Sequence, residues 1–160
     1  TLQYLASLFA VGSLTEEQAE YASDMLIVLE NLGNITGRCA ELDEYCVTKQ
    51  SKNLKFSEDA RTELTLDMTA VVQMFEQVLL YLKGEKDNPI AEFNKNKEKL
   101  IKLRNKARKN NAKRMQQKDC KKESGGLYNQ IMFSLERITH DCFNMLENNI
   151  SQFKVETGEE

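Results

Sequence analysis

The chain has 160 residues, which is the size of one ordinary domain. With 22 Lys or Arg, 25 Asp or Glu and one neutral His, its net charge is −3. Seven Gly, a single Pro and no Trp favour an all-α fold, and no stretch has the pattern of a strand. No apolar run approaches the roughly 18 to 20 residues that span a bilayer, and no segment has the pattern of a signal peptide.

An apolar pattern at helical spacing is already under way at Thr1 and continues to about Ala10. We therefore expect an incomplete first helix over this stretch and a longer polypeptide that precedes it. Gly12 and Ser13 end the pattern.

Thr15 and Gln18 form a capping box that predicts the start of a second helix, which should continue to about Lys49. Glu16 and Glu17 are favourable in its first turn because they face the positive end of the helix dipole. Its apolar residues recur at alternating steps of three and four, which is typical of a helix that packs against other helices. They are Met25, Val28, Leu32, Ile35, Cys39, Leu42 and Cys46.

Ser57, followed by two acids, predicts the start of a third helix that ends before Gly84. Asn88 and Pro89 predict the cap and first position of a fourth helix, which should run to about Lys121. The apolar stripe of the third helix is Leu64, Met68, Val71, Phe75, Val78 and Leu82. That of the fourth is Phe93, Leu100, Ile101, Leu103, Ala107 and Met115.

Ser124, Gly125 and Gly126 are expected to separate the fourth helix from a fifth, which should fade near Lys154. The apolar stripe of the fifth helix is Tyr128, Ile131, Leu135, Ile138, Cys142 and Met145. Short connections between long helices force neighbours to run antiparallel. The sequence thus predicts an up-and-down bundle of five helices over residues 1–154, with the first helix truncated, the last three packed as a unit, and a polar tail at 155–160.

The fourth helix is strongly basic, with 13 Lys or Arg and two acids between Lys95 and Lys122. The commoner interpretation is a solvated helix face. The alternative is an anionic partner such as a phospholipid headgroup layer, which predicts salt-sensitive binding to anionic vesicles by the helix at 95–122. Nucleic acid is not an expected partner, because no aromatic residue lies between Phe93 and Tyr128.

The four Cys residues contain no C-x-x-C pair, so the spacing of a zinc site is absent. Cys39, Cys46 and Cys142 occupy apolar stripe positions, where we expect buried free thiols. Free thiols favour a reducing compartment, and we expect the domain on the cytoplasmic side.

No recognisable catalytic constellation is present: the chain has one His, no G-x-S-x-G and no H-E-x-x-H. An enzyme is therefore the least expected class. Three polar pairs at i, i+4 each share a helix face and could hold a hard cation, zinc or iron, although such ridges are usually solvated charge. They are Glu30 with Asn34, Glu63 with Asp67, and Glu136 with His140.

Two stretches, VLENLGNITGRCAEL at 28–42 and SLERITHDCFNMLE at 134–147, resemble the repeated L-E-R-I-G-D-h-x-x-N-I-x-E signature of PhoU-like domains. The run LKFSEDARTELTLDM at 54–68 resembles the PhoU-like cytoplasmic tail of bacterial sodium/phosphate cotransporters more than the free-standing PhoU protein. YLASLFAVGSLTEEQAEY at 4–21 is similar to the helix end and helix start of that tail. The resemblance covers about residues 5–150.

The resemblance implies a fold of two three-helix bundles side by side and, in the PhoU branch, iron- or zinc-type clusters held by E-x-x-x-D pairs. By position these pairs would be Glu30 with Asn34 and Glu136 with His140, so the aspartate is replaced in both. Glu63 and Asp67 keep the spacing. We therefore expect no cofactor, with a divalent or iron- or zinc-type metal as the alternative, and a structural contact between helices for Glu136 and Arg137.

The resemblance further implies a regulatory, non-catalytic domain of a sodium-dependent phosphate cotransporter-related membrane protein. Its partner would be the transmembrane part of the same polypeptide, preceding Thr1, or a second copy in a homodimer. Two alternatives stay open. One is a free-standing PhoU-type metal-binding regulator of phosphate uptake, and the other is a generic helical oligomerisation or adaptor domain.

Overall fold

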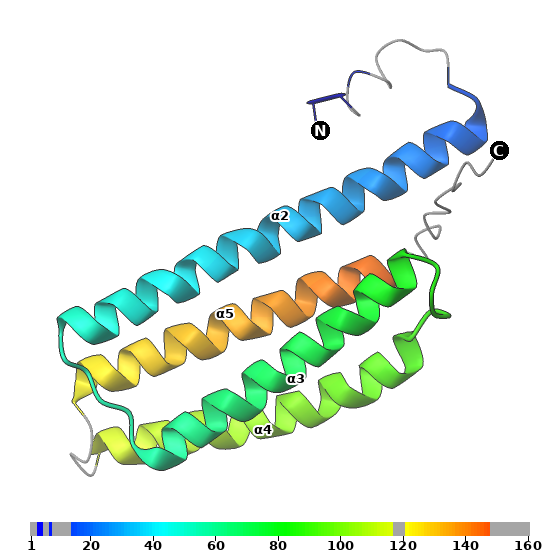
Figure 1. Ribbon diagram of the computed structural model, residues 1–160. Helices are drawn as coiled ribbons and strands as arrows, with labels where there is room; N and C mark the ends of the chain where they lie inside the picture. Colours follow the sequence, from blue (N-terminus) through cyan, green and yellow to red (C-terminus); the bar gives the residue numbers. More distant parts are fainter. Residues whose placement is uncertain (1–2, 5–6, 8–13, 117–120, 148–160) are drawn as a thin grey trace.

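The computed structural model describes residues 3–4, 7, 14–116 and 121–147, and the regular structure in these ranges is entirely α-helical. The predicted all-α fold is confirmed for this part of the chain. The predicted first helix falls mostly on residues outside these ranges, as does the polar tail at 155–160. Four helices follow one another along the chain: α2 (Glu16–Ser51), α3 (Glu58–Leu82), α4 (Ile90–Gln116) and α5 (Lys122–Glu147) (Figure 1).

Three of the helices start at the side chains that the sequence offers as caps. Thr15 Oγ1 accepts from the Gln18 N–H at 3.2 Å and Gln18 Oε1 accepts from the Thr15 N–H at 3.0 Å, which completes the predicted capping box. Ser57 Oγ accepts from a backbone N–H in the first turn of α3 at 3.2 Å. Asn88 Oδ1 accepts from the first N–H of α4 at 3.0 Å. These starts confirm the predictions.

The end of α3 also follows from local chemistry. Gly84 has a φ of 73°, a left-handed conformation that favours glycine because it lacks a Cβ. Its N–H donates to the Tyr81 carbonyl at 2.9 Å, and the Glu85 N–H donates to the Leu80 carbonyl at 3.0 Å. The glycine therefore closes the helix and turns the chain towards α4.

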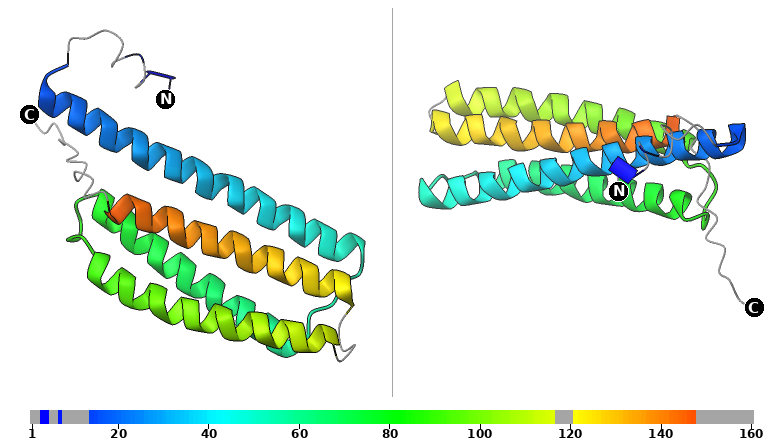
Figure 2. Two further views of the ribbon diagram at one scale, coloured as in Figure 1. Left: turned by 180° about the vertical axis from the view of Figure 1, so that it is seen from behind. Right: turned by 90° about the horizontal axis from the view of Figure 1, so that it is seen from above.

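Consecutive helices run in opposite directions, as an up-and-down bundle requires (Figure 1). α3, α4 and α5 each contact the other two, so the predicted unit of the last three helices is confirmed. Among the described helices α2 contacts α5 alone. As a result α2 and α4 lie at opposite edges of the bundle (Figure 2).

The core lies where the faces of the helices meet, and α5 contributes the most to it. Val28 and Ile35 of α2 reach this core through their contact with α5. Each fully buried apolar side chain contributes about 1.5–3 kcal/mol to the free energy of unfolding. The apolar side chains with no exposed surface are Val78, Phe93, Met132, Cys142, Met145 and Leu146.

The prediction that Ser124, Gly125 and Gly126 separate two helices is wrong, because α5 already begins at Lys122. A Cβ added at Gly125 would lie only 2.3 Å from Met115 Sδ of α4. Gly125 is thus suited to the close approach of α4 and α5, and helix packing overrides its weak intrinsic helix propensity.

Parts of the predicted apolar stripes are not buried. Cys142 is buried as expected, whereas Cys39 and Cys46 on α2 are exposed, and so are Met68 on α3 and Ile101 on α4. The expectation of burial is wrong for these four residues. For α2 the reason is that, among the described helices, α5 alone contacts it and covers only part of its stripe. Cys120 lies outside the described ranges.

Candidate functional site

The six candidate metal ligands are distributed over three helices. Glu30 and Asn34 are both exposed on α2. Glu63 and Asp67 lie on α3, and Glu136 and His140 lie on α5.

Asp67 is completely buried and forms an ion pair with Arg104 of α4, whose side chain is 2% exposed. Arg104 Nη2 lies 2.7 Å from Asp67 Oδ1, and Nε lies 2.9 Å from Oδ2. Arg104 Nη2 also donates to Thr139 Oγ1 of α5 at 2.9 Å. The pair therefore connects three helices at the centre of the unit formed by α3, α4 and α5.

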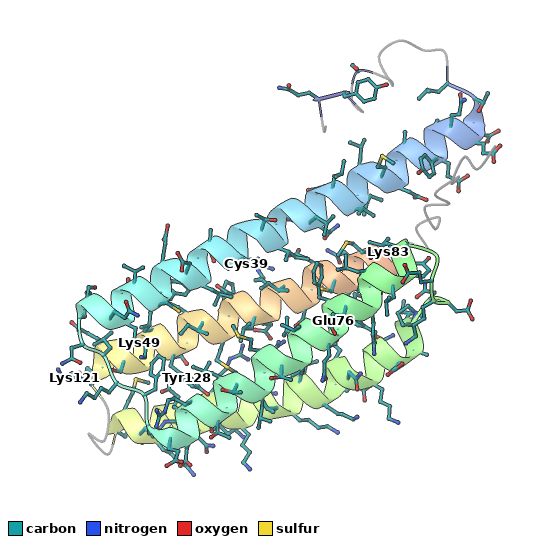
Figure 3. The ribbon with its side chains drawn as sticks, viewed as in Figure 1. Cys39, Lys49, Glu76, Lys83, Lys121 and Tyr128 are labelled. Carbon is teal, nitrogen blue, oxygen red and sulfur yellow. The ribbon has the colours of Figure 1, made fainter. Side chains whose placement is uncertain are left out.

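Glu63 holds a second set of polar contacts one turn earlier on α3. Its carboxylate accepts from Asn110 Nδ2 at 2.8 Å, from Arg114 Nη2 at 3.0 Å and from the Tyr128 hydroxyl at 2.7 Å. Burial acts to raise the pKa of Glu63, but these hydrogen bonds outweigh burial and hold the pKa below its usual range. Burial and the Glu63 carboxylate raise the pKa of Tyr128, which lies where α3 and α5 begin (Figure 3).

On α5, the two candidate ligands take part in separate contacts. Glu136 is paired with Arg108 of α4, so the expected contact between helices exists for this residue. Arg137 instead lies over the ring of Phe133 on its own helix, at 5.4 Å from the ring centroid. His140 is exposed, and its Nδ1 lies 3.3 Å from Asn144 Nδ2.

The contacts of Asp67 and Glu63 do not fit a metal ion held by these two carboxylates. Arg104 and Arg114 already bind the carboxylates of Asp67 and Glu63, and a guanidinium at a carboxylate repels a second cation. Within the described ranges, no group of three or more His, Cys, Asp or Glu side chains could hold a metal. Metal binding by the six residues stays a prediction from the resemblance.

Nine of the ten basic side chains of α4 divide between its two faces, and the tenth, Lys97, lies over the ring of Phe143 on α5. The three arginines of this helix pair with carboxylates on α3 and α5: they are Arg104, Arg108 and Arg114. Six exposed lysines follow the other face at alternating steps of four and three: Lys95, Lys99, Lys102, Lys106, Lys109 and Lys113. The choice of Arg at these three positions is the sequence feature that indicates pairing between helices, because Arg suits buried pairing with carboxylates better than Lys does.

A groove runs between α3 and α4 beside this row of lysines. It consists of two hollows of about 510 and 470 Å³ that share Leu66 of α3 and Leu103 of α4. Lys106 and Lys113 line the first hollow, and Lys99 lines the second. Exposed leucines and lysines therefore lie side by side along this groove.

None of the described helices is both long and apolar enough to cross a bilayer. Comparisons with family models, with curated proteins and with solved structures give no match to the chain.

Proposed function

We propose that this chain is a PhoU-like regulatory domain of a sodium-dependent phosphate cotransporter-related membrane protein and that it acts, without catalysis, on the cytoplasmic side. The support from the residues is the pair of signature-like stretches, which lie on α2 and α5. The run at 54–68 supports the transporter branch, and its Ser57 caps α3.

The observation that carries the proposal is the apolar surface left open on α2 and α3. Cys39 and Cys46 belong to the apolar stripe of α2 and are exposed, and Met68 and Val72 of α3 are 44% and 50% exposed. An apolar stripe at helical spacing is typical of a surface that packs against further helices. The resemblance implies two three-helix units. α3, α4 and α5 would form one of them, and α2 would complete the other, whose remaining helices would pack on this surface.

The proposed mechanism is a shift of the transporter between its states. A domain that binds one conformation of the transmembrane part more tightly than another favours that conformation by the difference in binding free energy. The domain thereby changes the transport rate without contacting the solute.

Thiol labelling tests the proposed packing. Maleimide should label Cys39 and Cys46 of the 160-residue chain but not Cys142, which is completely buried and whose pKa burial raises to about 12. In the full-length polypeptide in membranes, we expect Cys39 and Cys46 to be protected, as read by mass spectrometry of the labelled peptides. A Cys120→Ser background removes the fourth thiol. Equal labelling of Cys39 in the two samples would contradict the packing.

The coding sequence that precedes Thr1 tests the transporter connection separately. We expect several apolar segments of about 20 residues each. A start codon directly before Thr1 would rule the connection out.

A further inference from the structure

The groove between α3 and α4 extends along most of α3, so it is long enough to hold a second helix. Because its two hollows share Leu66 and Leu103, it is continuous from Asp59 near the start of α3 to Leu80 near its end. At 1.5 Å per residue this part of α3 is roughly 30 Å long, which corresponds to about 20 residues of a second helix beside it.

Leucines along the groove are open to solvent. Leu66 is 54% exposed and Leu80 is 39% exposed, while Leu103 is partly buried between α3 and α4. An amphipathic helix recognises a groove of this kind by laying its apolar face on such side chains. The exposed leucines thus define the face that a partner would cover.

Three lysines on α4 form one rim of the groove. These rim lysines, Lys99, Lys106 and Lys113, are exposed and seven residues apart. The acids that line the groove are Asp59, Glu63 and Glu76 on α3 and Glu92 on α4. Glu63 is paired with Arg114 and Glu92 with Lys86. Since seven residues make about two turns, a helix in the groove would meet one rim lysine every two turns.

We propose that the α3/α4 groove is a docking site for an amphipathic protein helix with an acidic flank. The partner places its apolar face on the leucines of the groove and its carboxylates, repeated every seven residues, against the rim lysines. The docking site follows from the groove alone and goes beyond the proposed role in phosphate transport.

A protein helix fits this surface better than an anionic bilayer does. The leucines lie in a concave groove between two helices, whereas a bilayer surface requires apolar side chains that project past the lysines. A cylinder of about 10 Å diameter matches the concave shape, and its regular repeat matches that of the rim lysines.

The helix itself offers a matched control. The outer lysines, Lys95, Lys102 and Lys109, are exposed, belong to the same helix and are also seven residues apart, but they do not line the groove. Changing either set of three to Glu alters the net charge by the same amount. All six side chains are exposed, so both variants should keep the fold, which circular dichroism checks.

Fluorescence anisotropy measures the docking with the 160-residue chain. The probe is a labelled peptide of about 20 residues, with Leu at heptad positions a and d and Glu at each e position. We expect the triple rim variant to bind about tenfold or more weakly and the triple outer variant to change affinity by less than about threefold. A peptide with Lys in place of Glu should bind the rim variant better than the original chain.

Equal weakening by the two variants would show that only net charge matters, and would overturn the proposal. Absence of peptide binding at low salt would overturn it as well. Vesicles of phosphatidylserine and phosphatidylcholine test whether the partner is an anionic bilayer instead of a protein helix. If the rim variant loses vesicle binding but keeps peptide binding, the groove binds lipid and the proposal is wrong. The assay contains no transporter, so its failure leaves the phosphate-transport proposal unaffected.

Discussion

Asp67 and Glu63 stand at the spacing of a metal-binding pair, yet each carboxylate faces an arginine of α4. The spacing could place both residues on one face of a helix, but it could not say whether that face is directed towards solvent or towards α4. The sequence did contain the partners, because Arg104 and Arg114 stand among ten lysines of the predicted basic stretch. The spacing thus singled out Asp67 and Glu63 but did not reveal their ion pairs with Arg104 and Arg114.

The buried pair predicts a large loss of stability when one partner is removed. Asp67→Ala leaves the Arg104 charge buried without its counter-charge, so we expect the free energy of unfolding to fall by about 3–5 kcal/mol. Urea unfolding measures this loss. Lys109→Ala, at an exposed position of α4, is the control and should change stability by less than about 0.5 kcal/mol. A loss below about 1 kcal/mol for Asp67→Ala would argue against the buried pair.

The contacts of Glu63 predict a dependence of stability on acid. Because the pKa of Glu63 is lower in the folded state than its ordinary value, the ionised group stabilises the fold above the ordinary pKa of about 4.3. That contribution is lost as the pH falls through the folded-state pKa. We therefore expect Glu63→Gln to be less stable than the original chain at pH 7, with the difference shrinking below about pH 4. A difference that does not change with pH would contradict this account.

At the scale of the helices, their starts were predictable because they depend on a few neighbouring residues. Thr15, Ser57 and Asn88 cap their helices as the sequence indicates. The start of α5 was not predictable, since Gly125 and Gly126 suit a loop as well as a close contact with a helix distant in the sequence. Which glycine packs closely depends on the position of α4, and local sequence does not contain that information.

The two glycines of α5 give a prediction of opposite effects. Gly126→Ala meets nothing within 4 Å and should stabilise the helix by up to about 1 kcal/mol. Gly125→Ala places a Cβ against Met115, and we expect it to be about 1–3 kcal/mol less stable than Gly126→Ala in thermal or urea unfolding. Adding Met115→Ala should recover part of the difference. Equal stability of the two Ala variants would mean that α4 and α5 lie further apart at Gly125 than the structure shows.

At the scale of the whole molecule, opposite edges carry opposite charge. α2 contains eight acids and two basic residues, and α4 contains ten basic residues and two acids. Because these helices lie at opposite edges, the field of the molecule would orient an approaching acidic partner towards α4 (Figure 2). Composition revealed the charge asymmetry, whereas its placement at an edge with the lysines outward required the three-dimensional arrangement.

The number of helices and the spacing of their apolar residues similarly predicted a bundle. They did not predict which apolar stripes stay exposed to solvent. Seven apolar positions on α2 predict a helix with several neighbours, while the described bundle supplies α5 alone. The exposed Cys39 and Cys46 are therefore the point at which sequence and structure disagree. Under the proposed function, the transmembrane part or a second copy would cover this surface.

Transport by the longer polypeptide tests this central claim most directly. The full-length protein and a form lacking residues 16–147 are reconstituted into liposomes, and the initial rate of sodium-driven uptake of radiolabelled phosphate is measured for each. We expect both forms to transport phosphate, with rates that differ by about fivefold or more, since a regulatory coupling of 1 kcal/mol or more has an effect of this size. Equal rates, or no sodium-dependent phosphate uptake by the full-length protein, would contradict the proposed function.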